Sequence, residues 1–226
     1  MRILITGGAG YLGSVLVEKM FAAKSEHDNY FHHFDKKSHF LNFNKIIVYD
    51  NLLYKQNVLL PFCYRNNFEF VYGDVRNYSL LKKNVEQADI IIPLAAIVGF
   101  PACDADPLLA KQVNYEHVKF VVDNLRKDQQ IILPVTNSQY GTSTDIVTEE
   151  TPVNPLSIYA KTKCDAESVV MDSGQGISLR LATVFGLSQR MRLDLLVNDF
   201  TYKAIRDGYI VLFEHKFNRN YIHLEM

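Results

Sequence analysis

The sequence lacks the compositional features that mark most specialised classes of protein. Positive and negative charges nearly cancel over the 226 residues, leaving a formal net charge of −1 without any basic block. The electrostatic signature of nucleic-acid binding is therefore missing, and we expect no nucleic-acid partner. No apolar run approaches the ~20 residues of a membrane span, and the N-terminus has no signal-peptide pattern. We expect a soluble, cytoplasmic protein without a membrane partner.

Cysteine is also scarce. Cys63, Cys103 and Cys164 are an odd number, and their spacing does not match a metal site. We interpret them as reduced thiols rather than a disulfide framework. Internal repeats and low-complexity tracts are absent as well. Hydrophobic residues, in contrast, make up 48% of the chain, enough for one large core with a small accessory lobe.

The first residues predict a strand, a glycine turn and a helix in direct succession. Ile3–Ile5 is a short apolar run of the kind found in buried parallel strands. The glycines that follow have dinucleotide-binding spacing and lie at Gly7, Gly8, Gly10 and Gly13. Tyr11–Phe21, which begins with Tyr11 and Leu12, has helical spacing, and free N–H groups at such a helix start suit a pyrophosphate. The alternative is an ordinary tight turn, but the strand before and the helix after favour dinucleotide binding.

Asp50 ends a second predicted strand, Ile46–Tyr49. An acidic residue there accepts hydrogen bonds from the adenosine ribose of NAD and disfavours NADP. Asp50 alternatively opens a turn with Asn51. The distance from Gly13 exceeds the usual ~20 residues, and an insertion at 24–45 accounts for the excess.

This insertion contains four histidines, at His27, His32, His33 and His39. Their spacing is irregular and no cysteine accompanies them, so we predict no metal site. We interpret the segment as a surface insertion, or as one that packs against a partner subunit through its phenylalanines.

Strands and helices alternate along the chain. We expect strands at residues 3–5, 46–49, 68–72, 88–94, 131–135, 176–183 and 209–213. We expect helices at residues 11–21, 78–85, 107–127, from 157 onwards, and 193–206. This alternation predicts an α/β fold with a Rossmann-type, doubly wound parallel sheet.

Ligands bind at the carboxyl ends of strands in such sheets. Asp74, followed by Val75, could face an adenine amino group there; alternatively, Asp74 caps the helix near Tyr78. Leu94, Ala95 and Ala96 end the fourth strand, and the two small residues would let a ligand lie against the backbone.

Tyr159 and Lys163 are four residues apart on one helix and therefore share a face. An ammonium beside a phenol is expected to lower the phenol pKa, so that Tyr159 can take a proton from a carbinol. Lys163 could also bind the nicotinamide ribose, and Thr136 offers a hydroxyl to the same substrate oxygen. Tyr115 and Lys119 form a second such pair, but they lie mid-helix, away from the glycine turn.

The chain resembles the extended short-chain dehydrogenase/reductases that act on nucleotide sugars, most closely the UDP-galactose 4-epimerase-like members. Matching motifs occur in family order at Thr6–Gly13, Asp50–Leu52, Gly73–Arg76, Leu94–Ala96, Tyr140–Gly141, Tyr159–Lys163 and Arg219–His223. The resemblance implies an NAD-binding Rossmann domain over 1–183 and a partial substrate-binding region over 184–226.

It further implies Thr136, Tyr159 and Lys163 as the catalytic set and a nucleoside-diphosphate sugar as substrate. The expected NAD contacts are Gly7, Gly10, Tyr11, Leu12, Gly13, Asp50, Asn51, Asp74, Val75, Leu94, Ala95, Ala96, Tyr159 and Lys163. Arg192, Asn198 and Arg219 are the expected substrate contacts, although both arginines could be ordinary surface residues. A homodimer is expected through the helices at 107–127 and 157–173.

Sugar 4,6-dehydratases of the family that the chain resembles carry a carboxylate in the stretch after the fifth strand. The corresponding stretch here, Thr136–Ser138, has none. We therefore expect an epimerase, with a 4-keto-sugar reductase or dehydratase of the same family as the alternative. The resemblance implies that family members usually continue for about another hundred residues beyond the position of Met226. We therefore expect either a fragment or a naturally shortened protein. A non-catalytic NAD-binding module is the third interpretation.

Overall fold

The computed structural model describes residues 1–25, 43–142, 146–213 and 215–225. The predicted insertion at 24–45, with its four histidines, lies mostly outside these described residues. Six parallel strands form the main sheet, in the order β3-β2-β1-β4-β5-β6. They are β1 (Arg2–Thr6), β2 (Lys45–Asp50), β3 (Phe68–Tyr72), β4 (Ile90–Pro93), β5 (Gln130–Thr136) and β6 (Gly176–Leu181). The predicted doubly wound Rossmann-type sheet is confirmed, and the strand order reverses between β1 and β4.

Helices cover both faces of this sheet because successive strand residues point to opposite sides. Leu4 of β1 packs with the helices on one face: α2 (Tyr78–Gln87), α5 (His117–Asp123) and α6 (Ile158–Asp172). Ile3 and Ile5 pack on the other face against α1 (Tyr11–Ser25). The strands are therefore buried on both sides, as their near-continuous apolar sequences require.

The predicted helix at 107–127 is interrupted. A short helix, α3 (Phe100–Ala105), precedes it, and α4 (Pro107–Lys111) then runs into the π-helical turn η2 (Gln112–Glu116) before α5. Asp106 caps α4 by accepting from the Leu109 N–H at 2.9 Å. Asn124 ends α5 early, since its side chain donates to the Phe120 carbonyl at 2.8 Å.

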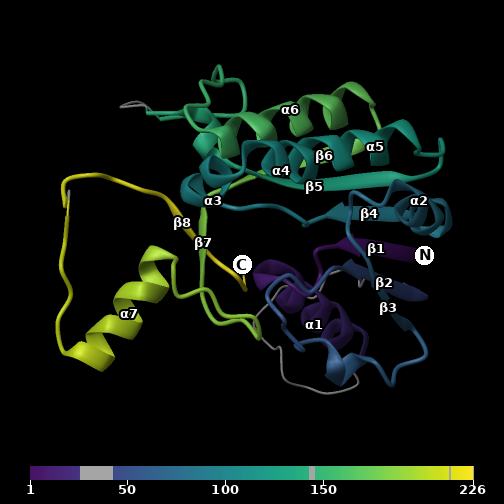
Figure 1. The fold of residues 1–226 in the computed structure, drawn as a ribbon, viewed down its shortest axis with the longest axis horizontal. Helices are drawn as coiled ribbons and strands as arrows, with labels where there is room; N and C mark the ends of the chain where they lie inside the picture. Colours follow the sequence, from purple (N-terminus) through teal and green to yellow (C-terminus); the bar gives the residue numbers. More distant parts are fainter. Residues whose placement is uncertain (26–42, 143–145, 214, 226) are drawn as a thin grey trace.

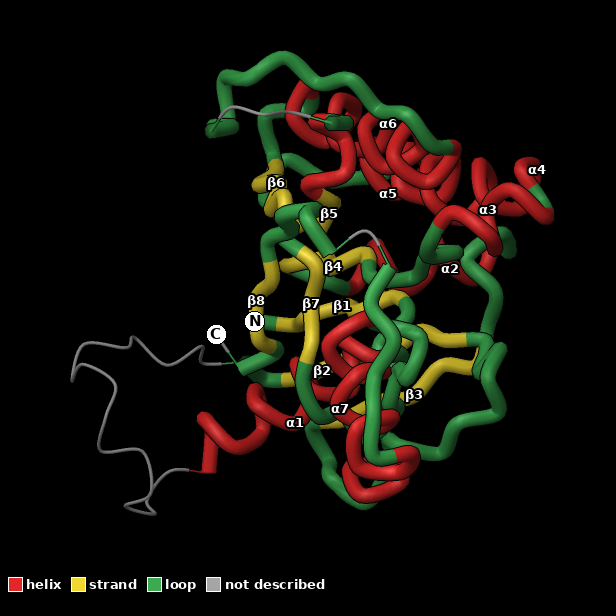
Figure 2. Tube along the Cα trace, turned by 90° about the vertical axis from the view of Figure 1, so that its left-hand side faces the viewer, coloured by secondary structure: helices red, strands yellow, loops and turns green. Residues whose placement is uncertain are grey.

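The C-terminal part differs most from expectation. The predicted strand at 176–183 ends at Leu181, and β7 (Thr183–Phe185) instead pairs with β8 (Tyr221–His223) in a separate two-stranded sheet. Both strands lie in front of the carboxyl ends of the main sheet (Figures 1 and 2). The predicted boundary at 183/184 falls inside β7, so the division into two domains stays a prediction.

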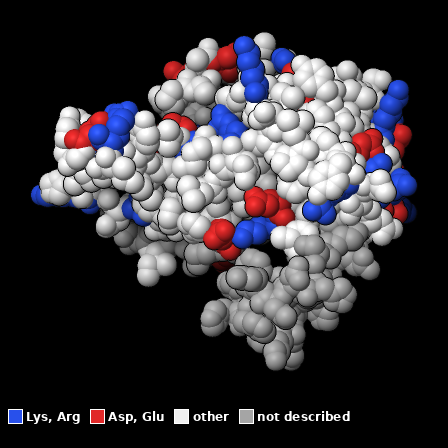
Figure 3. Space-filling model, turned by 90° about the horizontal axis from the view of Figure 1, so that it is seen from below, with Lys and Arg blue, Asp and Glu red and all other residues white. Residues whose placement is uncertain are grey.

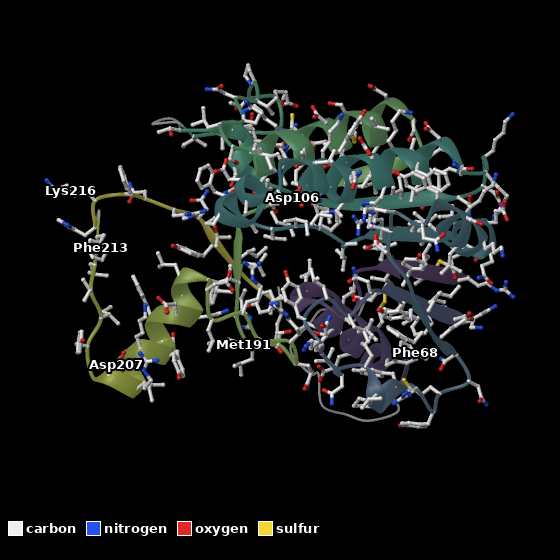
Figure 4. All side chains as sticks on the ribbon, in the orientation of Figure 1. Phe68, Asp106, Met191, Asp207, Phe213 and Lys216 are labelled. Carbon is white, nitrogen blue, oxygen red and sulfur yellow. The ribbon has the colours of Figure 1, made fainter. Side chains whose placement is uncertain are left out.

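The strand predicted at 209–213 is wrong. After α7 (Leu196–Asp207), these residues pair with no described strand, and Phe213 is 85% exposed. Phe213 and Lys216 both lie apart from the body of the molecule, at the far left of Figure 4. Apolar, β-prone residues form a strand only where a neighbouring strand can accept their backbone hydrogen bonds.

Charge is dispersed on the surface. On the face in Figure 3, acidic and basic side chains alternate in small groups rather than forming one basic field. No helix among the described residues is long and apolar enough to cross a membrane.

Candidate active site

The glycine turn between β1 and α1 is packed too tightly for side chains. Gly7 has a φ of +72° and donates its N–H to the Tyr49 carbonyl at 2.8 Å. A Cβ on Gly7 would lie 2.4 Å from the Ala95 nitrogen, and one on Gly13 would lie 2.6 Å from the Gly8 Cα. The turn therefore presses against both α1 and the loop after β4.

The start of α1 suits an anion. The helix is 15 residues long and has no acidic residue in its first turn. Its unpaired N–H groups and positive dipole end are therefore not neutralised by the helix itself. Gly10 contributes by closing the turn with its N–H on the Gly7 carbonyl at 3.0 Å.

Asp50 lies beside this turn, only 7% exposed. Its carboxylate accepts from the Ala9 N–H at 3.0 Å and from the Leu52 N–H at 2.8 Å. Burial raises the pKa of Asp50, while both N–H groups oppose the rise. The two oxygens retain lone pairs for further donors. Asp50 thus holds the turn in place, and its contact with a ribose stays a prediction.

Asp74 is paired at the carboxyl end of β3. Arg76 donates to it from Nε at 2.9 Å and from Nη2 at 2.8 Å, and these bonds lower the pKa of Asp74 to about 2. Asn51, the residue after β2, donates to the same carboxylate from Nδ2 at 3.5 Å. The alternative role as helix cap is wrong, because Asn77 caps α2 by accepting from the Leu80 N–H at 3.2 Å.

The remaining predicted cofactor contacts lie nearby. Val75 is buried and packs in the hydrophobic core, and its contact with a cofactor stays a prediction. Leu94, Ala95 and Ala96 form the partly exposed loop after β4, opposite Gly7. Leu12, in the first turn of α1, is likewise partly exposed.

Asn114 holds this loop, and sequence reasoning missed it. The fully buried side chain lies in η2, accepts from the Ile97 N–H at 2.8 Å and donates to the Ile97 carbonyl at 3.0 Å. Its amide also donates to the Thr162 hydroxyl on α6 at 3.2 Å. Asn114 therefore connects the loop after β4 to the helix with Tyr159. An amide between apolar residues on a predicted helix was the available signal.

The three predicted catalytic residues come from two neighbouring elements. Thr136 ends β5, and its Oγ1 accepts from the Ser138 N–H at 3.1 Å, which leaves the hydroxyl hydrogen available for another acceptor. Tyr159 and Lys163 lie on α6, which begins where Ser157 accepts from the Ala160 N–H at 3.1 Å. Lys163 is 4% exposed, and burial lowers its pKa to about 8, with Glu167 acting in the opposite direction.

The phenol of Tyr159 differs from expectation. Its pKa is raised to about 12, first because it is withdrawn from water and second because Cys103 lies close by. Arg192, rather than Lys163, is the positive group that lowers the pKa of Tyr159 in this structure. The expected fall in the pKa of Tyr159 is therefore wrong here, and Tyr159 holds its proton at neutral pH.

His117, which the sequence analysis did not single out, lies behind this site at the start of α5. It is fully buried, and its Nδ1 contacts the Val113 carbonyl, while Nε2 has no partner among the described residues. Desolvation is the main cause that lowers the pKa of His117 to about 4, and the charge of Lys163 adds to it. The imidazole is therefore neutral at physiological pH.

The predicted substrate residues separate into two places. Arg192 pairs with Asp194, and its charge lowers the pKa of Tyr159. It follows Met191 on the segment before α7 (Figure 4). Asn198 is 6% exposed and bonds within the protein, to Tyr11 and to the Arg192 carbonyl. Arg219 is exposed and donates to the Thr183 hydroxyl at 3.0 Å, on the two-stranded sheet. Their substrate contacts stay predictions.

Within the part of the chain that the structure describes, no group of three or more His, Cys, Asp or Glu residues is placed to hold a metal ion. The site therefore offers a bare helix start, a buried carboxylate and a hydroxyl–phenol–ammonium set. These groups suit binding of an anionic ligand and proton transfer at an oxygen.

Comparison with known proteins agrees with this chemistry. The model of the NAD dependent epimerase/dehydratase family matches residues 3–225. UDP-glucuronic acid decarboxylase 1 of Arabidopsis thaliana is 28% identical over 229 residues, covering 91% of this chain and 45% of that protein. The uncharacterized UDP-glucose epimerase YtcB of Bacillus subtilis is 28% identical over 200 residues, covering 84% and 58%. The chain thus spans about half the length of the curated relatives it matches.

Solved structures share the fold. The dTDP-glucose 4,6-dehydratase DesIV from Streptomyces venezuelae, with NAD and TYD bound, has a TM-score of 0.81 at 24% identity. The UDP-glucuronic acid 4-epimerase from Bacillus cereus, in complex with UDP-glucuronic acid and NAD, has a TM-score of 0.80 at 22% identity. Both matches cover 100% of this chain and about 70% of the other chain, 69% and 70% respectively.

Proposed function

The chain belongs to the NAD-dependent epimerase/dehydratase family, and from that premise we propose that it is a nucleotide-sugar epimerase. It would bind NAD and invert a carbinol centre of a nucleoside-diphosphate sugar by reversible hydride transfer. The observation that supports the proposal is that Thr136 ends β5 and that Tyr159 and Lys163 lie near the start of α6, in the same parallel sheet whose strand β1 leads into the glycine turn.

The residues fit a dinucleotide. The turn at Gly7 and Gly13 has space only for backbone, and the helix start behind it bears no neutralising carboxylate. Such a start binds a pyrophosphate through its N–H groups. Asp50 is held by two N–H groups and keeps lone pairs for ribose hydroxyls. Lys163 is the cation available for the nicotinamide ribose.

Proton transfer follows from the two hydroxyls. Thr136 uses its oxygen to accept from Ser138, so its hydrogen can orient a substrate oxygen. Tyr159 Oη holds a proton at neutral pH and can donate it to a developing alkoxide; as a base, it needs nearby positive charge, which Arg192 supplies in part. When bound, NAD supplies the hydride acceptor and a further positive charge, which would favour the phenolate.

An epimerase accounts for the residues at hand better than its relatives' other reactions do. Thr136–Ser138 offers no carboxylate for the acid and base steps of dehydration. A 4-keto-sugar reductase needs the same hydride machinery and is distinguished by stoichiometric consumption of NADH, since an epimerase regenerates its cofactor. We also retain the homodimer through α4–α5 and α6 as a proposal.

Replacement of Tyr159 by Phe tests the catalytic role. Turnover of UDP-glucose or UDP-glucuronic acid should fall on the order of 10²–10⁴-fold. NAD affinity measured by calorimetry should stay within about twofold, because the substitution removes only one hydroxyl from the proposed NAD contacts. Tyr115→Phe, in the second tyrosine–lysine pair, is the matched control and should retain turnover. Unchanged turnover in Tyr159→Phe would refute the role.

A non-catalytic NAD-binding module is the second candidate, because the glycine turn is built for a close backbone approach while burial raises the pKa of Tyr159 to about 12. This candidate predicts NAD binding without measurable affinity for UDP-sugars. Micromolar binding of UDP-glucose would argue against it, and failure to bind NAD at millimolar concentration would defeat both candidates.

A further inference from the structure

We propose that Tyr11 and Asn198 couple the dinucleotide turn to the substrate-binding segment, so that nucleotide binding at one site strengthens binding at the other. We call these two residues, with Ser14, Gly186 and Ser188, the latch. The inference rests on the proposed function for the identity of the two ligands. Its basis is a set of hydrogen bonds between residues that lie 174 to 187 positions apart in the sequence.

The phenol of Tyr11 is the centre of the latch. Tyr11 is the first residue of α1 and is 8% exposed. Its Oη donates to the Gly186 carbonyl at 2.7 Å and accepts from Asn198 Nδ2 at 3.0 Å. One hydroxyl on the dinucleotide-binding helix therefore binds both the end of β7 and the first turn of α7.

A second contact holds the backbone of the same helical turn. Ser188 donates its hydroxyl to the Tyr11 carbonyl at 2.8 Å, and its oxygen lies 3.0 Å from the hydroxyl oxygen of Ser14. Ser14 is 1% exposed, so this contact is shielded from water. The side chain and the backbone of the first turn of α1 are thus both bonded to residues 186–198.

Asn198 carries the connection onward to the catalytic helix. Its Oδ1 accepts from the Gly186 N–H at 3.0 Å, and Nδ2 donates to the Arg192 carbonyl at 3.0 Å as well as to Tyr11. The guanidinium of Arg192 in turn lowers the pKa of Tyr159. These hydrogen bonds therefore connect the first turn of α1 to the segment that carries Arg192.

This arrangement makes coupling the expected result. A pyrophosphate at the start of α1 fixes the turn to which Tyr11 belongs, and a sugar nucleotide near Arg192 and Asn198 fixes the other end of the same hydrogen bonds. When each ligand orders the same contacts, the second ligand binds a segment that is already ordered. Thermodynamic linkage then requires the enhancement to be equal in both directions.

The test measures NAD affinity by calorimetry with and without saturating UDP. The unmodified protein should bind NAD about 5- to 10-fold more tightly with UDP present. Tyr11→Phe retains the ring but removes both hydrogen bonds of the hydroxyl. Whatever its NAD affinity alone, the ratio of its NAD affinities with and without UDP should fall to about one. Tyr209→Phe removes a hydroxyl from an exposed ring outside the latch and should keep the enhancement.

Asn198→Ala provides the second variant. It should lose the enhancement to the same extent, and the double variant should lose no more than either single change, because both act on one hydrogen-bonded unit. A full enhancement in Tyr11→Phe, or none in the unmodified protein, would overturn the proposal. A different result would refute the proposed function: the unmodified protein would bind neither NAD nor UDP. The coupling proposal, which rests on that function, would then be refuted as well.

Discussion

The buried imidazole of His117 predicts a loss of stability in mild acid. Its Nδ1 is engaged by the Val113 carbonyl, and its Nε2 lies in the interior without a partner among the described residues. Protonation would therefore place a charge in a dry environment that already contains the ammonium of Lys163 nearby. These conditions lower the pKa of His117 from 6.5 to about 4 in the folded protein.

The sign of the effect follows from proton linkage. Between pH 6.5 and 4, the unfolded chain binds a proton at His117 and the folded chain does not, so acid favours unfolding. The contribution of His117 to stability is full above pH 6.5 and is lost as the pH falls towards 4. The gap between the two pKa values corresponds to about 3 kcal/mol in all, of which about 2 kcal/mol is lost by pH 5.

Other groups act in separate ranges. The pKa of Asp74 is lowered to about 2 from 3.8, so the stability that it provides is lost only below about pH 4. Burial raises the pKa of Asp50, which favours the folded state as the pH falls and thus opposes His117. These contributions cancel when the pH dependence of the unfolding free energy is compared between two proteins that both retain Asp50 and Asp74.

Urea unfolding at pH 7 and pH 5 provides the assay. His117→Gln keeps a side chain that can donate to Val113 but does not titrate. Between pH 7 and pH 5, the free energy of unfolding of this variant should fall by about 2 kcal/mol less than that of the unmodified protein. His215→Gln replaces an exposed histidine and is the control. Its free energy of unfolding should change between pH 7 and pH 5 by the same amount as that of the unmodified protein. Identical pH dependence in the unmodified protein and His117→Gln would refute the reasoning.

Two further predictions concern buried charges. Lys163→Met should abolish the proposed epimerase turnover yet stabilise the nucleotide-free protein by up to about 3 kcal/mol at pH 7. The reason is that burial lowers the pKa of Lys163 from 10.5 to about 8, so the cost of the buried ammonium is full below pH 8. The melting temperature at pH 7 checks it, and the gain should shrink as the pH rises towards 10.5. Arg180→Met should cost about 3 kcal/mol, because Glu167 is 7% exposed and would lose its bonds to Arg180 Nε at 3.0 and 3.1 Å. Denaturant melts should show part of this loss recovered when Glu167→Gln is added.

The parts of the fold that depend on local patterns were predictable from the sequence. The turn at Gly7–Gly13 is encoded by glycine spacing between an apolar run and a helical one, and the structure has it in place. The helix with Tyr159 and Lys163 was equally accessible, since Ser157 is a residue type that caps helices and the pair shares one face. The position of these residues was therefore predicted correctly, while their roles stay predictions.

The properties that depend on distant neighbours were not predictable. The π-helical turn around Asn114 forms where the Asn114 side chain bonds both backbone groups of Ile97. Helical periodicity in the sequence does not predict such a contact. The pKa of Tyr159 responds to burial and to Cys103 and Arg192, which are remote in sequence, and not to its helical neighbour Lys163. Spacing along a helix establishes proximity, but the dielectric surroundings decide the direction of a pKa shift.

Asn198 shows how these two kinds of information combine. The resemblance assigns it to the substrate, whereas in the structure its amide bonds Tyr11, Gly186 and the Arg192 carbonyl. These roles are compatible only if a sugar nucleotide uses the remaining lone pair of the Asn198 oxygen or displaces one of the amide's present bonds. Use of the lone pair would reinforce the bond to Tyr11 and tighten the dinucleotide turn, whereas displacement would release it. The enhancement proposed for NAD and UDP therefore requires the first mode of contact, and a weakening of NAD binding by UDP would indicate displacement and overturn the proposal.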